Sequence, residues 1–239
     1  MLIFKNTIKT SVLLAGLGGL IVTIAGVLGG GSSGSLTFGL LIAFVMVGGS
    51  YWFSDKLALK SAKARIVTEE DAPLFFGMVK ELATRAGMPM PRVAIAPSEQ
   101  PNAFATGRNP RHAVVCATEG LLRSMPEDEL RGVMAHELMH VKHRDILIGS
   151  VAAAIATAIS FIANMAMWAS MFGGRGNNDN ERANPFALIL VSMLAPIAAS
   201  LLQMAISRSR EFEADRGAAE LLGNGNSLAN ALERIEASA

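Results

Sequence analysis

The chain has 239 residues, of which 51% are hydrophobic and only 17% are charged, and its mean hydropathy is +0.38. This composition is too apolar and too poor in charge for an ordinary soluble enzyme. The formal net charge of +1 indicates no polyanion partner, so nucleic-acid binding is not expected.

Apolar residues are concentrated in four runs that contain no charged side chain. Each run is long enough to cross, as a helix, a hydrocarbon core about 30 Å thick. We therefore predict four candidate transmembrane helices, at residues 10–30, 36–53, 146–172 and 185–206. The first run is also compatible with a signal peptide, but its apolar core is longer than such peptides use and another run follows almost at once. An uncleaved transmembrane hairpin over residues 1–54 is favoured.

Positive charges flank this first hairpin at both ends. Lys5 and Lys9 precede its first apolar run, Lys56 and Lys60 follow its second, and residues 31–35 between the two runs carry no charge. The positive-inside rule therefore places the N-terminus, and the part of the chain that follows the hairpin, in the cytoplasm.

A small α+β domain is predicted between the two pairs of apolar runs. Its predicted elements are a helix at residues 72–87, strands at 92–96 and 112–118, and a helix at 119–124. Residues 103–106 are predicted either as a strand that pairs with an extended substrate or as a connecting loop. Cys116, the only cysteine, is expected to be packed in its strand, and its isolation agrees with a reducing compartment.

His136, Glu137 and His140 form the pattern H-E-x-x-H. Histidines four residues apart project from one face of a helix, so both imidazoles can bind one Zn²⁺ at about 2.0–2.1 Å. Glu137 lies beside the open metal position, where it can take a proton from a bound water. Acids at residues 127–129 mark the helix start and an apolar flank follows, which favours a packed helix over a solvated one. His143 is too far along a straight helix to reach the same ion and is predicted at the surface.

A third metal ligand is expected from elsewhere in the chain. Glu211 and Asp215 stand four residues apart, which suits a ligand followed by a carboxylate that orients a histidine. A plain charged helix, in which Arg208 and Arg210 pair with Glu211 and Glu213, explains the same residues. The spacing alone leaves both alternatives open.

Three motifs together resemble the M48 family of zinc metallopeptidases. They are His136-Glu137-x-x-His140, Glu211-x-x-x-Asp215 within Ser-Arg-x-Arg-Glu-Phe-x-Ala-Asp, and Asn-Ala-Phe-Ala-Thr-Gly at residues 102–107. The arrangement of apolar segments is similar to that of the HtpX-type branch, membrane-bound quality-control proteases of bacteria. The similarity covers nearly the whole chain.

The resemblance implies a zincin-like α+β metallopeptidase domain with a small sheet, within a mainly α membrane protein. It also implies that Glu211 is the third zinc ligand and that Asp215 is a supporting carboxylate for His136. Residues expected near the substrate are Asn102, Ala103 and Phe104.

A shared metal site constrains the topology. The two histidines and Glu211 can meet only on one side of a membrane, so an even number of crossings must separate them. A second hairpin over residues 146–206 satisfies this condition, as does an arrangement in which neither run crosses. Charges at residues 127–131 and 142–145 flank the H-E-x-x-H helix. Cleavage is therefore expected at the cytoplasmic membrane surface rather than within the bilayer.

The residues predict a membrane-bound zinc endopeptidase with one Zn²⁺ per chain. The resemblance implies a location in the bacterial inner membrane and the degradation of misfolded or damaged membrane proteins in stress-related quality control. The enzyme's expected partners are polypeptide substrates and the lipid bilayer, and nothing indicates an oligomeric state. The expected parts are a hairpin at 1–54, peptidase segments at 55–145 and 207–239, and a second hairpin at 146–206.

Two other functions are compatible with the same residues: a membrane scaffold or binding protein with a non-catalytic zinc, and a processing protease for lipidated C-termini. A donor for the developing oxyanion is typically His, Arg or Tyr. No histidine follows His143 and Tyr51 is the only tyrosine, so the sequence identifies no donor. Because the family's pattern continues further, we expect the chain to be truncated at Ala239.

Overall fold

The computed structural model describes residues 32–146 and 208–237, together with isolated positions between residues 8 and 26. The predicted run 185–206 and all but the first residue of run 146–172 lie outside the described residues, and run 10–30 is described only at isolated positions. The chain divides into two compact units. One includes the described residues 52–146 and 208–237, and the other includes residues 32–51.

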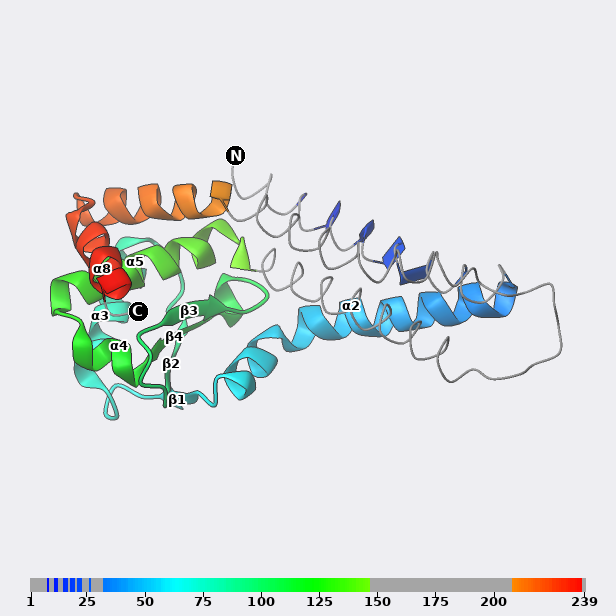
Figure 1. Cartoon of the computed structure of the whole chain (residues 1–239), viewed down its shortest axis with the longest axis horizontal. Helices are drawn as coiled ribbons and strands as arrows, with labels where there is room; N and C mark the ends of the chain where they lie inside the picture. The colour runs from blue at the N-terminus through cyan, green and yellow to red at the C-terminus, as the bar shows by residue number, and fades with distance from the viewer. Residues whose placement is uncertain are drawn as a thin grey trace. The chain divides into compact units, whose positions relative to one another are not determined.

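Helix α2 (Ser33–Ser61) contains the whole of the predicted run 36–53 (Figure 1). Many of its large apolar side chains are exposed, among them Phe38, Phe44 and Val45. Of the helices in the described ranges, none combines the length and the apolar character needed to cross a membrane.

A four-stranded sheet, with strand order β1-β2-β4-β3, organises the first unit (Figure 1). Its strands are β1 (Arg65–Val67), β2 (Arg92–Ala96), β3 (Ala103–Thr106) and β4 (Val114–Thr118). β2 and β4 pair in parallel, whereas the two outer strands pair antiparallel to their neighbours. The predicted strand 92–96 is confirmed, and residues 103–106 form a strand rather than a loop. β3 is an edge strand of this sheet, and β1 was not predicted.

Alternation along the strands gives the sheet two different faces. Val93 and Val115 point into the main core, which α3 (Pro73–Arg85) and α5 (Glu127–His143) complete. Cys116 points the other way, into a smaller cluster that Leu59 and Phe104 cover. The last turns of α2 therefore pack on the face of the sheet opposite α5.

Local sequence signals explain the ends of the helices. Pro73 begins α3, and Gly87 follows it with a positive φ of 64°, as is common after a helix C-terminus. The Thr118 hydroxyl accepts a hydrogen bond from the Leu121 N–H and caps α4 (Glu119–Ser124). α5 begins after Pro126 with three acids in its first turn.

Two further helical segments complete the first unit. Residues 208–222 are helical, and α8 (Asn226–Ala237) packs against α5. Gly132 permits this close approach, because a Cβ there would lie 2.6 Å from the backbone nitrogen of Leu228. The Arg234 guanidinium also donates two hydrogen bonds to the Glu129 carboxylate, at 2.5 and 2.8 Å, and so joins α8 to α5.

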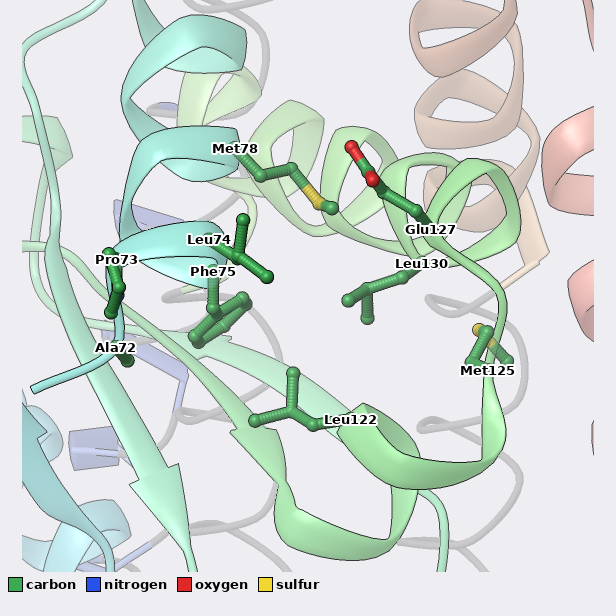
Figure 2. Close-up of a pocket in the computed structure, with 9 residues that line it drawn as sticks. All are labelled: Ala72, Pro73, Leu74, Phe75, Met78, Leu122, Met125, Glu127 and Leu130. Atoms are coloured by element: carbon green, nitrogen blue, oxygen red, sulfur yellow. The ribbon is translucent and has the colours of Figure 1, made fainter.

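An apolar cavity of about 360 Å³ lies between the N-terminal turns of α3 and α5 and helix α4 (Figure 2). Leu74, Phe75 and Met78 of α3 line one side, and Leu122 and Leu130 line the other. None of the predicted site residues lines this cavity, so the chemistry is expected elsewhere.

Candidate active site

His136 and His140 meet Glu211 at one point in the first unit. Their Nε2 atoms lie 3.0 Å apart, and Oε2 of Glu211 lies 3.3 Å from Nε2 of His136 and 3.6 Å from Nε2 of His140. The two imidazole rings are almost perpendicular, at 86°. Within the described residues, these three side chains form the one group able to hold a metal ion between them.

The three atoms are spaced as the ligands of one zinc ion would be. A tetrahedral ion with bonds of about 2.0–2.1 Å has ligand atoms roughly 3.3–3.4 Å apart. The observed separations of 3.0, 3.3 and 3.6 Å fall around this value. Two nitrogens and one carboxylate oxygen are also a donor set found at catalytic zinc sites. The residues present therefore fit a zinc ion.

A carboxylate also contacts the other nitrogen of each histidine ring. Oδ1 of Asp215 lies 2.9 Å from Nδ1 of His136, and Oδ1 of Asp145 lies 3.1 Å from Nδ1 of His140. Carboxylate oxygens accept, so the hydrogen bond with Asp145 places a proton on Nδ1 of His140, whereas Asp215 faces Nδ1 of His136 as a nearby negative charge without hydrogen-bond geometry. That tautomer of His140 leaves an Nε2 lone pair directed at the common point, as a metal ligand requires.

The position of Asp145 corrects an interpretation made from the sequence. From the sequence, Asp145 is predicted among the solvated charges that flank the H-E-x-x-H helix, but the residue is only 2% exposed. Arg144 adopts a left-handed conformation, with φ of 57°, which ends α5 and turns the chain back. The Asp145 side chain consequently returns toward His140. His143, predicted at the surface, is half-buried against the segment 208–222, where Gly217 faces it.

Electrostatics favour positive charge at the two histidines. Burial opposes their protonation, but hydrogen bonds to carboxylates outweigh it: the pKa of His140 is raised to about 10, chiefly through Asp145 and Glu211, and that of His136 is also raised. Hydrogen bonds from both histidines hold the pKa of Glu211 well below its usual range. In the metal-free protein, protons on the histidines supply this positive charge, and a bound metal cation can replace these protons.

Glu137 lies beside this cluster in a different environment. Burial raises the pKa of its carboxyl, while the neighbouring histidines and a hydrogen bond from the backbone N–H of Ala105 act in the opposite direction. A carboxylate whose pKa is raised toward neutrality is suited to accept and return a proton. The contact with Ala105, which the sequence did not indicate, also ties Glu137 to the edge strand β3.

A cavity of about 310 Å³ opens beside His136. Asn102 and Ala103 line it together with His136, Glu137 and Glu211, and apolar side chains of α8 form another part of its wall. Two of the three residues predicted near the substrate therefore lie at the cavity.

Phe104 is the exception among the residues predicted near the substrate. Its side chain packs in the cluster on the opposite face of the sheet, because successive residues of a strand point to opposite sides. The Phe104 side chain is therefore directed away from the cavity, and its place near the substrate stays a prediction.

Glu211 lies on the helical segment 208–222, four residues before Asp215, and both carboxylates reach His136. This geometry favours the alternative of a metal ligand over that of a plain charged helix. Arg210 donates a hydrogen bond to the backbone oxygen of Asp145, at 3.3 Å. The two segments that carry the ligands are thereby joined next to the site.

Comparison with known proteins bears on the same residues. The family model described as Peptidase family M48 matches residues 76–236. Proteins named "Protease HtpX homolog" from Burkholderia mallei, Burkholderia pseudomallei and Burkholderia thailandensis are each 56% identical over 230 residues. These matches cover 96% of this chain and 79% of each relative.

A solved structure, that of Ste24p from S. mikatae, aligns with a TM-score of 0.55 at 21% identity. The alignment covers 98% of this chain, which spans 58% of the Ste24p chain. At this identity the likeness concerns the fold alone.

Proposed function

The chain belongs to peptidase family M48 and is a metalloprotease, and we propose that it is a membrane-bound zinc endopeptidase that degrades damaged or misfolded membrane proteins at the cytoplasmic surface. The observation that carries the proposal is the convergence of His136, His140 and Glu211 on one point, with Glu137 beside it. One Zn²⁺ per chain would be held by these three ligands. Three protein ligands leave an open position, whereas a structural zinc is usually closed by four.

The roles of the residues follow from their contacts. When bound, zinc polarises the scissile carbonyl and lowers the pKa of a coordinated water. The Glu137 carboxylate accepts a proton from the attacking water and returns it to the leaving amine nitrogen. Asp145 accepts a hydrogen bond from Nδ1–H of His140 and so orients this imidazole, and Asp215 lies beside Nδ1 of His136 as a negative charge.

The substrate is proposed to bind as an extended strand along β3. β3 is the last strand of the sheet, and its Ala105 N–H reaches Glu137. An added strand would place its scissile bond next to the cavity at Asn102 and Ala103. In that cavity, His136 is the one described side chain of the types that commonly bind an oxyanion, and it is already a metal ligand. We assign no oxyanion donor.

Membrane attachment is part of the proposal. It rests on the four charge-free runs and on the exposed apolar side chains of α2. Positive charges that flank the runs favour a cytoplasmic active site in a bacterial inner membrane. We propose hairpins at residues 1–54 and 146–206 and peptidase segments at 55–145 and 207–239. The quality-control role and the membrane-protein substrates are proposed from the resemblance to HtpX-type proteases.

Degradation of casein by the purified full chain tests the activity. Cleavage should require zinc, stop when a chelator removes it, and return when one equivalent per chain is restored. Cleavage that persists after all metal is removed would overturn the proposal.

A further inference from the structure

Two cations lie over two adjacent aromatic rings near the end of α2. Nζ of Lys56 is 5.5 Å from the ring centroid of Phe53, and the guanidinium carbon of Arg108 is 5.9 Å from that of Trp52. These distances are typical of cation–π contacts. Trp52 and Phe53 are nevertheless 60% and 51% exposed. The loop after β3 supplies Arg108, so the contact joins this loop to α2.

Several cations of this region have no carboxylate partner. In the described part of the chain, Lys56, Lys60, Arg108 and Arg111 make no ion pair with a carboxylate. Carboxylate-paired cations elsewhere in the unit include Lys80, Arg85, Arg123, Arg131 and Arg234. Arg92 also pairs with Asp55 of α2, whereas Lys142 and Arg144 at the end of α5 make no such pair in the described part of the chain. Unpaired cations and exposed aromatic rings are therefore found together at one place.

This combination matches the boundary between lipid hydrocarbon and phosphate headgroups. Tryptophan is enriched at that depth, and basic side chains there are attracted to anionic lipids. A guanidinium held near a ring by a cation–π contact keeps five N–H donors, which phosphate oxygens can accept. We propose that Trp52, Phe53, Lys56 and Arg108 form a surface that docks on anionic phospholipid headgroups, an inference that rests on the proposed membrane location.

Docking at this surface would act on the substrate strand. The Thr106 hydroxyl of β3 donates to the backbone oxygen of Ser54, at 3.5 Å, and both residues are buried. Phe104 of β3 packs on the cluster that the last turns of α2 cover. Ala105 lies between these two contacts, and its backbone N–H donates a hydrogen bond to Glu137. Docking on headgroups would therefore fix the height of β3 and Glu137 above the bilayer.

Fluorescence of Trp52 reports the contact directly. The chain has two tryptophans, so Trp168→Phe leaves Trp52 as the single emitter. The full chain carrying this substitution is placed in bilayer discs of anionic phosphatidylglycerol or of neutral phosphatidylcholine, with and without brominated acyl chains. We expect brominated lipids to quench Trp52, and anionic lipid to raise the cleavage rate of a membrane-embedded reporter several-fold over neutral lipid.

A matched pair of variants tests the charges. Lys56→Gln with Arg108→Gln should bring the ratio of rates in anionic and neutral discs close to one, since each cation near the surface contributes roughly fivefold to headgroup attraction. Lys80→Gln with Arg123→Gln removes two exposed, carboxylate-paired cations and should keep the wild-type ratio. Casein cleavage in detergent should be unchanged in both.

Two results would overturn the inference. One is a Trp52 that an aqueous quencher reaches and brominated lipids do not. The other is an identical lipid response of the two double variants. If casein is still cleaved in detergent when either result is found, the proposed function stands and only the headgroup contact fails.

Discussion

Asp145 and His140 form a buried contact at the end of the H-E-x-x-H helix, with Oδ1 of Asp145 3.1 Å from Nδ1 of His140. The left-handed turn at Arg144 creates it, and the backbone N–H of Asp145 also bonds the carbonyl oxygen of His140, at 3.3 Å. One short turn thus ends the helix and fixes the tautomer of a proposed ligand.

Asp145→Asn should weaken zinc binding. The amide keeps the size of the side chain but loses the charge that holds Nδ1–H, and loss of such a partner typically costs about 10–100-fold in metal affinity. Competition with a chromogenic chelator measures the change. Asp128→Asn, an exposed acid in the first turn of the same helix, is the control and should bind zinc like the wild type. Equal affinities of the two variants would contradict this role for Asp145.

Glu211→Gln should remove the proposed carboxylate ligand while leaving the fold intact. We expect zinc content after dialysis to fall well below one per chain, with the circular dichroism spectrum unchanged. Glu213→Gln changes a neighbouring carboxylate of the same helix that is not among those paired with His136 or His140, and should retain one zinc. A Glu211→Gln protein that keeps a full equivalent of zinc would show that the third ligand is another residue.

Gly132→Ala should loosen the packing of α8 on α5. The added Cβ would lie 2.6–2.9 Å from backbone atoms of Ser227 and Leu228, which cannot move aside as a flexible side chain can. Overpacking of this kind costs about 1–3 kcal/mol. Gly77→Ala in α3 meets nothing within 4 Å and should be neutral or slightly stabilising. Thermal unfolding of the two variants measures the difference, and equal midpoints would contradict the close approach.

The Cys116 thiol should be unreactive in the folded protein. Burial raises its pKa to about 12, and because the thiolate is the disfavoured form, the thiol stays protonated from pH 7 to well above the range in which a free cysteine ionises. Ellman's reagent at pH 8.5 should modify the unfolded chain and leave the folded chain unlabelled over the same time. Rapid labelling of the folded protein would place Cys116 outside the core.

Local patterns in the sequence predicted several elements of the fold, although the strand expected at 112–118 begins only at Val114, after a 3-10 turn over Pro110–His112. The strand 92–96 and the helix 119–124 appear with the predicted bounds, since β-branched runs and a Thr cap mark them. β1 escaped prediction because three residues are too few to show an alternating pattern. β1 forms because antiparallel pairing with β2 satisfies the hydrogen-bonding groups of its backbone.

The same limit applies to the site: contacts set by residue spacing along a helix could be predicted, but contacts set by a backbone turn or by strand register could not. Residues four apart share one face of a helix, so spacing alone groups His136 with His140 and Glu211 with Asp215. The contact of Asp145 could not be predicted, because it depends on a positive φ at Arg144, an arginine that carries no such signal. The side-chain direction of Phe104 was likewise undetermined until the pairing of β3 with β4 fixed its register.

The central claim is that Glu137 moves the proton while three other residues hold the metal. Glu137→Ala in the purified full chain tests it most directly, with casein cleavage and zinc content measured on the same preparation. The account predicts a loss of at least about 100-fold in cleavage rate, with one zinc per chain still bound. Unchanged proteolysis in a preparation free of wild-type protein would contradict it.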